Sequence, residues 1–139
     1  MKKVQLSFLV FVATASCFCQ RKDFVITRYG AVSGGITNST IAIQHAIDDA
    51  NKSGGGRVIV PAGKFLSGVI PLKSNVELYV EKEAVLLAST NRADYGPSQK
   101  ASAWIEADNA RNISITGKGL IYGQCDLLIK DIYKKLISG

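Results

Sequence analysis

Short apolar runs separated by turn residues dominate the hydrophobic and polar pattern along the chain. Many of these runs alternate apolar and polar positions, which is typical of β-strands whose two faces meet different surroundings. A polar stretch at 89–102 interrupts the series and is predicted to be an excursion loop. The predicted strands are 24–27, 57–60, 65–67, 69–70, 76–80, 85–87, 104–107, 113–116 and 120–122.

One segment, 38–51, has the spacing of an amphipathic helix instead. Asn38 or Ser39 can cap its start, and the glycines that follow Ser53 can stop it. His45 and the acidic doublet Asp48-Asp49 fall away from the apolar face and are predicted to face water. The apolar positions, which recur at intervals of three and four, are Ile43, Ala46, Ile47 and Ala50.

Three consecutive glycines, 54–56, lie between this helix and the strand 57–60, beside basic residues. Phosphate-binding loops run in the opposite order, from strand through glycine loop to helix, because the helix N-terminus faces the anion. Gly63-Lys64 is followed by Phe65, where a P-loop has Ser or Thr. The order of elements excludes a P-loop, so the glycines are predicted to stop the helix and to turn the chain tightly into the strand 57–60.

Segments 75–80 and 112–117 resemble each other, since each begins with Asn and continues with alternating apolar positions. Short strands at near-regular spacing, with such repeated segments, predict a coil of β-strands. Each turn of this coil, called a rung, pairs with the next. At about 20–25 residues per turn, three or four rungs fit the chain. A β-sandwich with irregular loops is the alternative. In a coil, alternation points five side chains inward: Val76, Leu78, Val80, Ile113 and Ile115.

The N-terminus has the three parts of a secretory signal: basic Lys2 and Lys3, an apolar run at 6–15, and small residues after it. The run is too short to span a bilayer, which needs about 20 residues. We predict a signal peptide at 1–19 and a secreted or periplasmic protein. A cut after Ala15 and a lipid anchor at Cys17 are alternatives, as is a buried N-terminal strand.

The charge balance and the cysteine content limit which binding partners and cofactors are expected. Without 1–19, 15 basic and 11 acidic residues remain, a mild excess with no basic stripe, so nucleic acid is not an expected partner. Cys125 is then the one remaining cysteine and cannot form an internal disulfide. The cysteine spacing matches no metal pattern, and no cofactor is expected.

Several motifs, in this order, resemble the opening of the polygalacturonases of glycoside hydrolase family 28, within the pectate-lyase-like superfamily. They are Tyr29-Gly30-Ala31, NSTIAIQ at 38–44, GGGRVIVPAG at 54–63, LKSNVEL at 72–78 and NISITGKG at 112–119. The resemblance covers about 23–124 and implies an all-β fold, a right-handed parallel β-helix with a helix capping its N-terminal end. An amphipathic helix would protect both the apolar interior and the unpaired backbone of the first rung.

The resemblance also implies hydrolysis of α-1,4-galacturonosyl bonds in pectin with inversion, by separated acid and base carboxyls. The family signature, Asn-Thr-Asp, Asp-Asp, Gly-His-Gly and Arg-Ile-Lys, belongs to later rungs and has no counterpart here. No catalytic, cofactor-binding or metal-binding residue is therefore assigned. The residues considered and set aside are His45, Asp48, Asp49, Asp94, Asp108 and Asp126.

The end of the chain departs from the family pattern at Cys125. Leu128, Ile129, Ile132 and Leu136 fall on one face of a predicted helix, with lysines elsewhere. This segment is interpreted as a shortened helical excursion or a replacement end, with a membrane-binding helix as a third possibility.

We therefore expect 20–139 to be the N-terminal part of a β-helix domain of a secreted polygalacturonase-like hydrolase, inactive alone and monomeric. Its parent would act on pectic polysaccharide. A polysaccharide lyase of the same superfamily, which would need Ca²⁺ and a basic residue, is one alternative. A non-catalytic β-helical carbohydrate-binding or adhesin-like module is the other.

Overall fold

Parallel pairing of short strands organises residues 21–97 and 103–138, which the computed structural model describes. Three sheets result, with strand orders β1-β2-β5-β8, β3-β6-β9 and β4-β7. The elements in chain order are β1 (Asp23–Val25), the 3₁₀ helix η1 (Ile26–Tyr29), α1 (Thr40–Lys52), β2 (Gly56–Val60), β3 (Gly63–Ser67), β4 (Ile70–Pro71), β5 (Val76–Val80), β6 (Ala84–Ala88), the 3₁₀ helix η2 (Arg92–Tyr95), β7 (Ile105–Glu106), β8 (Ser114–Gly117), β9 (Leu120–Tyr122) and α2 (Cys125–Ser138).

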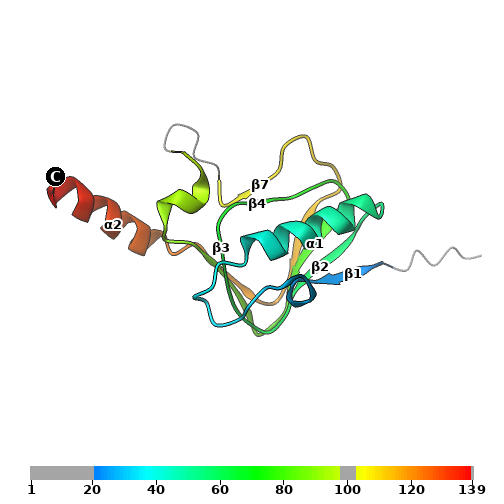
Figure 1. Ribbon diagram of the computed structural model, residues 1–139. Coiled ribbons are helices and arrows are strands. Elements are labelled where there is room, and N and C mark those ends of the chain that lie inside the picture. The colour runs from blue at the N-terminus through cyan, green and yellow to red at the C-terminus, as the bar shows by residue number, and fades with distance from the viewer. Residues whose placement is uncertain (1–20, 98–102, 139) are drawn as a thin grey trace, which may run out of the picture.

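The chain visits the three sheets in turn, so successive rungs stack as a right-handed parallel β-helix (Figure 1). This confirms the predicted fold class and rules out the sandwich. Strands β2, β3 and β4 form the first rung, β5, β6 and β7 the second, and β8 and β9 part of a third. Twenty positions separate Arg57 from Glu77, its neighbour on the next rung, whereas 37 separate Asn75 from Asn112. The longer second interval contains the predicted excursion, where η2 forms.

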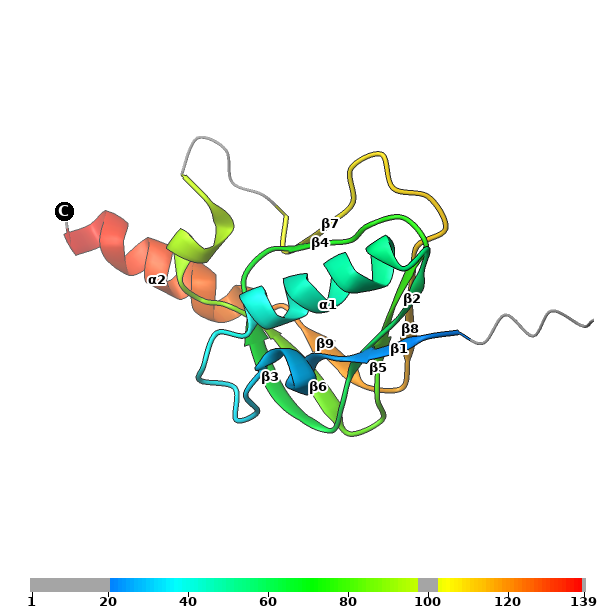
Figure 2. The same cartoon turned by 45° about the vertical axis from the view of Figure 1, so that its right-hand side comes forward.

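Helix α1 covers the first rung, as predicted, and Figures 1 and 2 show it lying along that end of the coil. It contacts β1, β2 and β4. At its start the backbone N–H of Thr40 donates to Asn38 Oδ1 at 2.9 Å, whereas Ser39 makes no side-chain cap bond. At its end Gly55 N donates to Ala50 O. The side chains it buries are Ala42, Ile43, Ala46, Ile47 and Ala50.

Columns of stacked apolar side chains fill the interior. Val58, Leu78 and Ile115 occupy one register position on three successive strands. The first two are fully buried, but Ile115 is 44% exposed and Ile113 is 36% exposed. Pairing and direction therefore agree with the prediction, whereas burial of Ile113 and Ile115 does not. In the described part of the chain, no rung lies beyond β8 to cover them.

The first predicted strand, 24–27, ends earlier than expected. Strand β1 stops at Val25, and Ile26 begins η1 because its carbonyl accepts a hydrogen bond from Ala31 N. Gly30, at φ 94°, closes this turn and lets Ile26 pack fully buried in the core under α1. The other predicted strands agree with the structure to within two residues.

Helix α2 confirms the helix predicted after Cys125, and in both views it points away from the coil (Figures 1 and 2). Of its predicted apolar face, Ile129 is 51% exposed, and the other three side chains lie outside the described ones. No helix among the described residues is long and apolar enough to cross a membrane. The predicted signal peptide and Cys17 lie outside the described residues.

Candidate functional site: an ion-pair network outside the coil

The acidic doublet of α1 holds the helix in place. Asp48 Oδ1 lies 2.7 Å from Lys73 Nζ and accepts from Gln44 Nε2 at 3.1 Å. The hydrogen bond from Lys73 lowers the pKa of Asp48 against the opposing effect of burial. Asp49, by contrast, is exposed and accepts from the hydroxyl of Tyr29 at 3.1 Å. The prediction that the whole doublet is solvated surface is correct for Asp49 and wrong for Asp48.

The other candidate residues occupy separate elements. His45 is exposed on α1, as predicted. Asp94 accepts from the hydroxyl of Ser89 in the excursion. The remaining two acids also have partners close in sequence: Asp108 accepts from Asn109 Nδ2 at 2.8 Å, and Asp126 accepts from Tyr122 Oη at 3.3 Å. Among the described residues, no group of three or more His, Cys, Asp or Glu could hold a metal ion.

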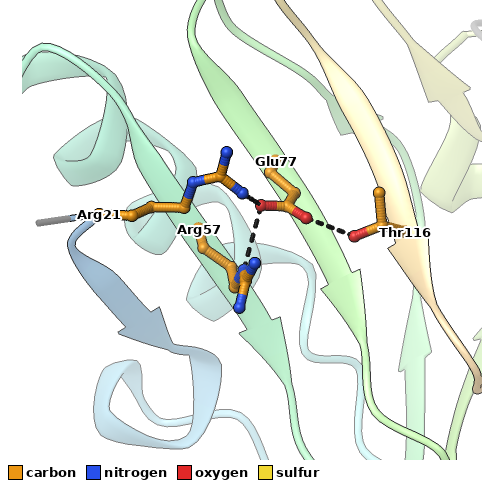
Figure 3. A network of polar contacts seen from close by, with 4 residues as sticks. All are labelled: Arg21, Arg57, Glu77 and Thr116. Carbon is orange, nitrogen blue, oxygen red and sulfur yellow. Dashed lines mark hydrogen bonds and ion pairs between the residues drawn. The ribbon is translucent and has the colours of Figure 1, made fainter. Parts of the chain in front are cut away.

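The most connected charged side chain is Glu77, which sequence reasoning did not single out. It lies on the outer side of β5 and is only 8% exposed (Figure 3). Its Oε2 accepts from Arg57 Nε at 3.0 Å and from Arg21, while Oε1 accepts from Thr116 Oγ1. The guanidinium of Arg57 also lies over the ring of Tyr79, 4.7 Å from its centroid.

The sequence did carry a signal for this network. Arg57 and Glu77 pair directly in register, one rung apart, so opposite charges face each other across adjacent strands. Finding the pair requires the register between rungs, which the alternation of one strand does not give. Arg21 precedes β1, and its approach to Glu77 could not be read from any local pattern.

The electrostatics of Glu77 favour a structural role. Burial alone would raise its pKa, but hydrogen bonds from Thr116 and Arg57, with the charges of Arg57 and Arg21, outweigh burial and lower it. A carboxyl held ionised in this way cannot donate a proton as a general acid. Because both oxygens already accept hydrogen bonds, it is also poorly placed to activate water. The network ties the N-terminal segment and three strands of one sheet together.

The glycine-rich turn borders a recess of about 420 Å³, which is lined by Arg21, Lys22, Ser53, Gly54, Gly55, Gly56 and Asn75. The backbone N–H groups of all three glycines are already used, because they donate to Asn51 O, Ala50 O and Asn75 O. They are therefore not available to cradle a phosphate. A side chain at Gly55 would place its Cβ 2.8 Å from Asn75 O, and Gly55 has φ 128°. These glycines serve the tight entry into the first rung, as predicted.

Comparison with known proteins identifies the family. Residues 24–124 match the family described as "Rhamnogalacturonase A/epimerase, pectate lyase-like", and the chain belongs to it. The chain is 37% identical over 115 residues to an exo-poly-α-D-galacturonosidase of Dickeya chrysanthemi, a match that covers 70% of this chain and 19% of that protein. It is 37% identical over 107 residues to an exopolygalacturonase of Zea mays, covering 73% of this chain and 25% of that protein.

A solved structure agrees with these sequence matches. The exopolygalacturonase of Thermotoga maritima superposes with a TM-score of 0.68 at 31% identity, over 73% of this chain and 25% of that one. The similarity to polygalacturonases of glycoside hydrolase family 28 that the motifs indicated is thereby confirmed. The chain spans about a fifth to a quarter of the length of the two curated relatives named above.

Proposed function

We propose that this chain is the N-terminal segment of a secreted hydrolase that cleaves α-1,4-galacturonosyl bonds in pectin. The observation that carries the proposal is the 37% identity over 115 residues to an exo-poly-α-D-galacturonosidase. The family match over 24–124 supports it, because that family is described as pectate lyase-like and the matched residues form parallel rungs covered by α1. The substrate class we propose is a pectic polyuronate, and the mild net positive charge of the chain is compatible with such a polyanion.

We further propose that these rungs alone lack the catalytic chemistry. Inverting hydrolysis needs two carboxyls, one to protonate the leaving oxygen and one to activate water, held about 6.5–9.5 Å apart. The acids Asp48 and Glu77 form ion pairs, and Asp94 and Asp126 accept hydrogen bonds from close neighbours in sequence. The segment's role is then to form the capped end of the coil, because a stack of repeats needs a terminal cap with a polar outer face to stay soluble.

Export and a monomeric, pectin-directed parent complete the proposal. The basic start, apolar run and small residues at 1–19 support secretion to the periplasm or the exterior. Polygalacturonate, the expected substrate, lies outside the cell, which agrees with a secreted protein. The lyase alternative would require Ca²⁺, and the non-catalytic alternative would require binding without turnover.

The test measures the reducing ends that are released from polygalacturonate. It compares the purified 139-residue chain with the protein encoded by the longest reading frame that contains this chain. We expect no release by the 139-residue chain and release by the longer product. Release by the short chain that an Asp→Asn change abolishes would contradict the proposal. Ca²⁺-dependent formation of unsaturated ends by the longer product would favour the lyase, and binding without either product would favour the module.

A further inference from the structure

Three segments of the chain have the pattern Asn-x-Ser/Thr of an N-glycosylation acceptor: 38–40, 51–53 and 112–114. The middle residue is not proline in any of them, so none is excluded by its sequence. A glycan at any of these positions requires the export that we propose above. Because so short a pattern recurs by chance, the surroundings of each asparagine decide which of them can carry a glycan.

Asn38 has the surroundings that a glycan needs. It is exposed, and its Oδ1 caps α1 by accepting hydrogen bonds from Thr40 N, at 2.9 Å, and from the Thr40 hydroxyl. Within the described residues, Asn38 Nδ2 donates no hydrogen bond, and this is the atom to which the sugar would be joined. An N-linked glycan replaces one hydrogen of Nδ2 and leaves Oδ1 in place. The cap of α1 would therefore survive the modification.

The other two asparagines use Nδ2 to hold the fold together. Asn51 is half-buried near the end of α1, and its Nδ2 donates to Ser74 O at 2.9 Å, which ties the helix to the turn before β5. Asn112 Nδ2 donates to Asn75 Oδ1 at 3.0 Å, which ties one rung to the next. A sugar on either Nδ2 would crowd the atoms that these bonds bring close. The native fold therefore disfavours a glycan at Asn51 and at Asn112.

Exposed apolar side chains lie on both sides of Asn38 in the sequence. Ile36 is 87% exposed and Ile41 is 68% exposed. They belong to the capped end of the coil, because Ser39 N donates to Leu66 O at 2.8 Å and so holds the segment before α1 against β3 (Figure 2). Their exposure therefore does not depend on how far the coil continues beyond β9. Exposed apolar side chains favour association between molecules, whereas a glycan is bulky and solubilising.

We propose that Asn38 carries an N-linked glycan when the chain passes through a secretory pathway that contains an oligosaccharyltransferase, and that this glycan shields Ile36 and Ile41. In the transfer, Nδ2 forms a bond to the anomeric carbon of a lipid-linked oligosaccharide. The bond from that carbon to the pyrophosphate oxygen breaks, the lipid pyrophosphate leaves with the electron pair, and Nδ2 loses one proton. The folded chain carries no glycan at Asn51 or Asn112.

Expression of the 139-residue chain in insect cells tests the assignment, with glycopeptides mapped by mass spectrometry in the medium and in the microsomal fraction. We expect the secreted chain to carry one glycan, on the peptide that contains Asn38. Asn38→Asp keeps a capping oxygen and should abolish the glycan, whereas the matched control Asn112→Asp should leave it in place. An unmodified Asn38 in both fractions, or a secreted chain with its glycan on Asn51 or Asn112, overturns the assignment.

A second version, in which a host signal peptide replaces 1–19, separates this inference from the proposed export. If only the second version is secreted, the export assigned to 1–19 is wrong, while the state of Asn38 still decides the glycan. An unmodified Asn38 in either secreted version overturns the glycan and leaves the export standing.

The shielding role has its own measurement. Peptide N-glycosidase removes the glycan from the folded chain and converts Asn38 to Asp, so the treated chain should match the Asn38→Asp variant. Light scattering should show more self-association in both of these than in the glycosylated chain. Ile36→Ser combined with Ile41→Ser should remove that difference, because no apolar surface remains to be shielded there. Equal self-association with and without the glycan overturns the shielding role.

Discussion

At the scale of single residues, two asparagines explain why the sequences before β5 and β8 resemble each other. Asn75 and Asn112 have φ values of 64° and 54°, in the left-handed region that Asn tolerates better than most residues. Asn112 Nδ2 donates to Asn75 Oδ1 at 3.0 Å, so the two side chains form a ladder between rungs. Asn75 O also accepts from Gly56 N. The repeated Asn thus meets a conformational need that recurs at each rung.

Substitution of Asn75 should separate backbone strain from the loss of the ladder. Asn75→Ala removes the side-chain bond and places a Cβ-bearing residue that lacks the polar group at φ 64°, so we expect a loss of about 2 kcal/mol in unfolding free energy. Asn75→Gly removes the same bond but accepts positive φ, so it should cost about 1 kcal/mol less. Urea unfolding of both variants measures the difference. Equal losses would mean that strain at this position is negligible.

The Glu77 network predicts a specific dependence of stability on pH. Folding lowers the pKa of Glu77 from its ordinary value of 4.5, so the unfolded chain binds a proton first as the pH falls. The stabilisation is therefore complete above about pH 4.5 and is lost as the pH falls through the folded-state pKa. Glu77→Gln should lower stability at neutral pH by about 1–3 kcal/mol and flatten the acid limb of the stability curve. Thermal melts at several pH values check this.

Glu83→Gln serves as the control for that experiment, because the Glu83 side chain is exposed. It should leave the neutral-pH melting temperature nearly unchanged and keep the acid limb of the wild-type chain. If both variants flatten the acid limb equally, the effect belongs to net charge and not to the network.

At the scale of elements, α1 is the part on which solubility depends most directly. Ile47 is fully buried between the helix and the first rung, whereas His45 is exposed on the same helix. Ile47→Asp should cost at least about 4 kcal/mol, because it buries an unpaired charge and loosens the cap. His45→Asp, the matched control, should change stability by less than about 0.5 kcal/mol. Soluble yield and melting temperature measure both, and a soluble, normally melting Ile47→Asp would contradict the capping role.

The interior column Val58–Leu78–Ile115 predicts that equal truncations cost less toward β8, beyond which the described residues form no further rung. Leu78 is fully buried and Ile115 is 44% exposed, although they are direct partners in register. Leu78→Ala should therefore cost about 2–4 kcal/mol, and Ile115→Ala about half of that or less. Chemical denaturation at low protein concentration provides the comparison. Equal costs would indicate that Ile115 is covered in solution.

At the scale of the whole molecule, local rules in the sequence predicted most of the fold. Alternation of apolar and polar residues identified the strands. Apolar residues at intervals of three and four, among them Ile43, Ala46 and Ile47, identified the capping helix. The repeated segments that begin with Asn75 and Asn112 indicated stacked rungs. The start of η1 was missed because Ile26 has strong β propensity but is drawn into a turn by tertiary packing under α1. The exposure of Ile115 was missed because a periodic pattern predicts direction and not the presence of a further rung.

The charged network shows what local patterns do not contain. Glu77 was passed over because on one strand it is simply an alternating polar residue, and its burial depends on Arg57 one rung away and Arg21 before the first strand. Lys73 and Asp48 likewise meet only when α1 is laid across the coil. Such contacts follow from the register between rungs and from helix placement, which are properties of the assembled molecule.

In the 139-residue chain, a coil of stacked rungs should lose its order progressively from β8 and β9, beyond which the described residues form no further rung. Strands β2 and β5 are paired on both sides, whereas β8 and β9 are each paired on one side in the described chain. Each rung is stabilised mainly by its neighbours, so local opening should cost least at β8 and β9 and most at β2 and β5. Hydrogen exchange at low protein concentration should therefore be fastest, among the strands, in peptides covering 113–122. Peptides covering 56–60 and 76–80 should exchange slowest, near the rate of global unfolding. Uniform protection of all strands in the dilute sample would contradict this order and indicate that the coil unfolds as one unit.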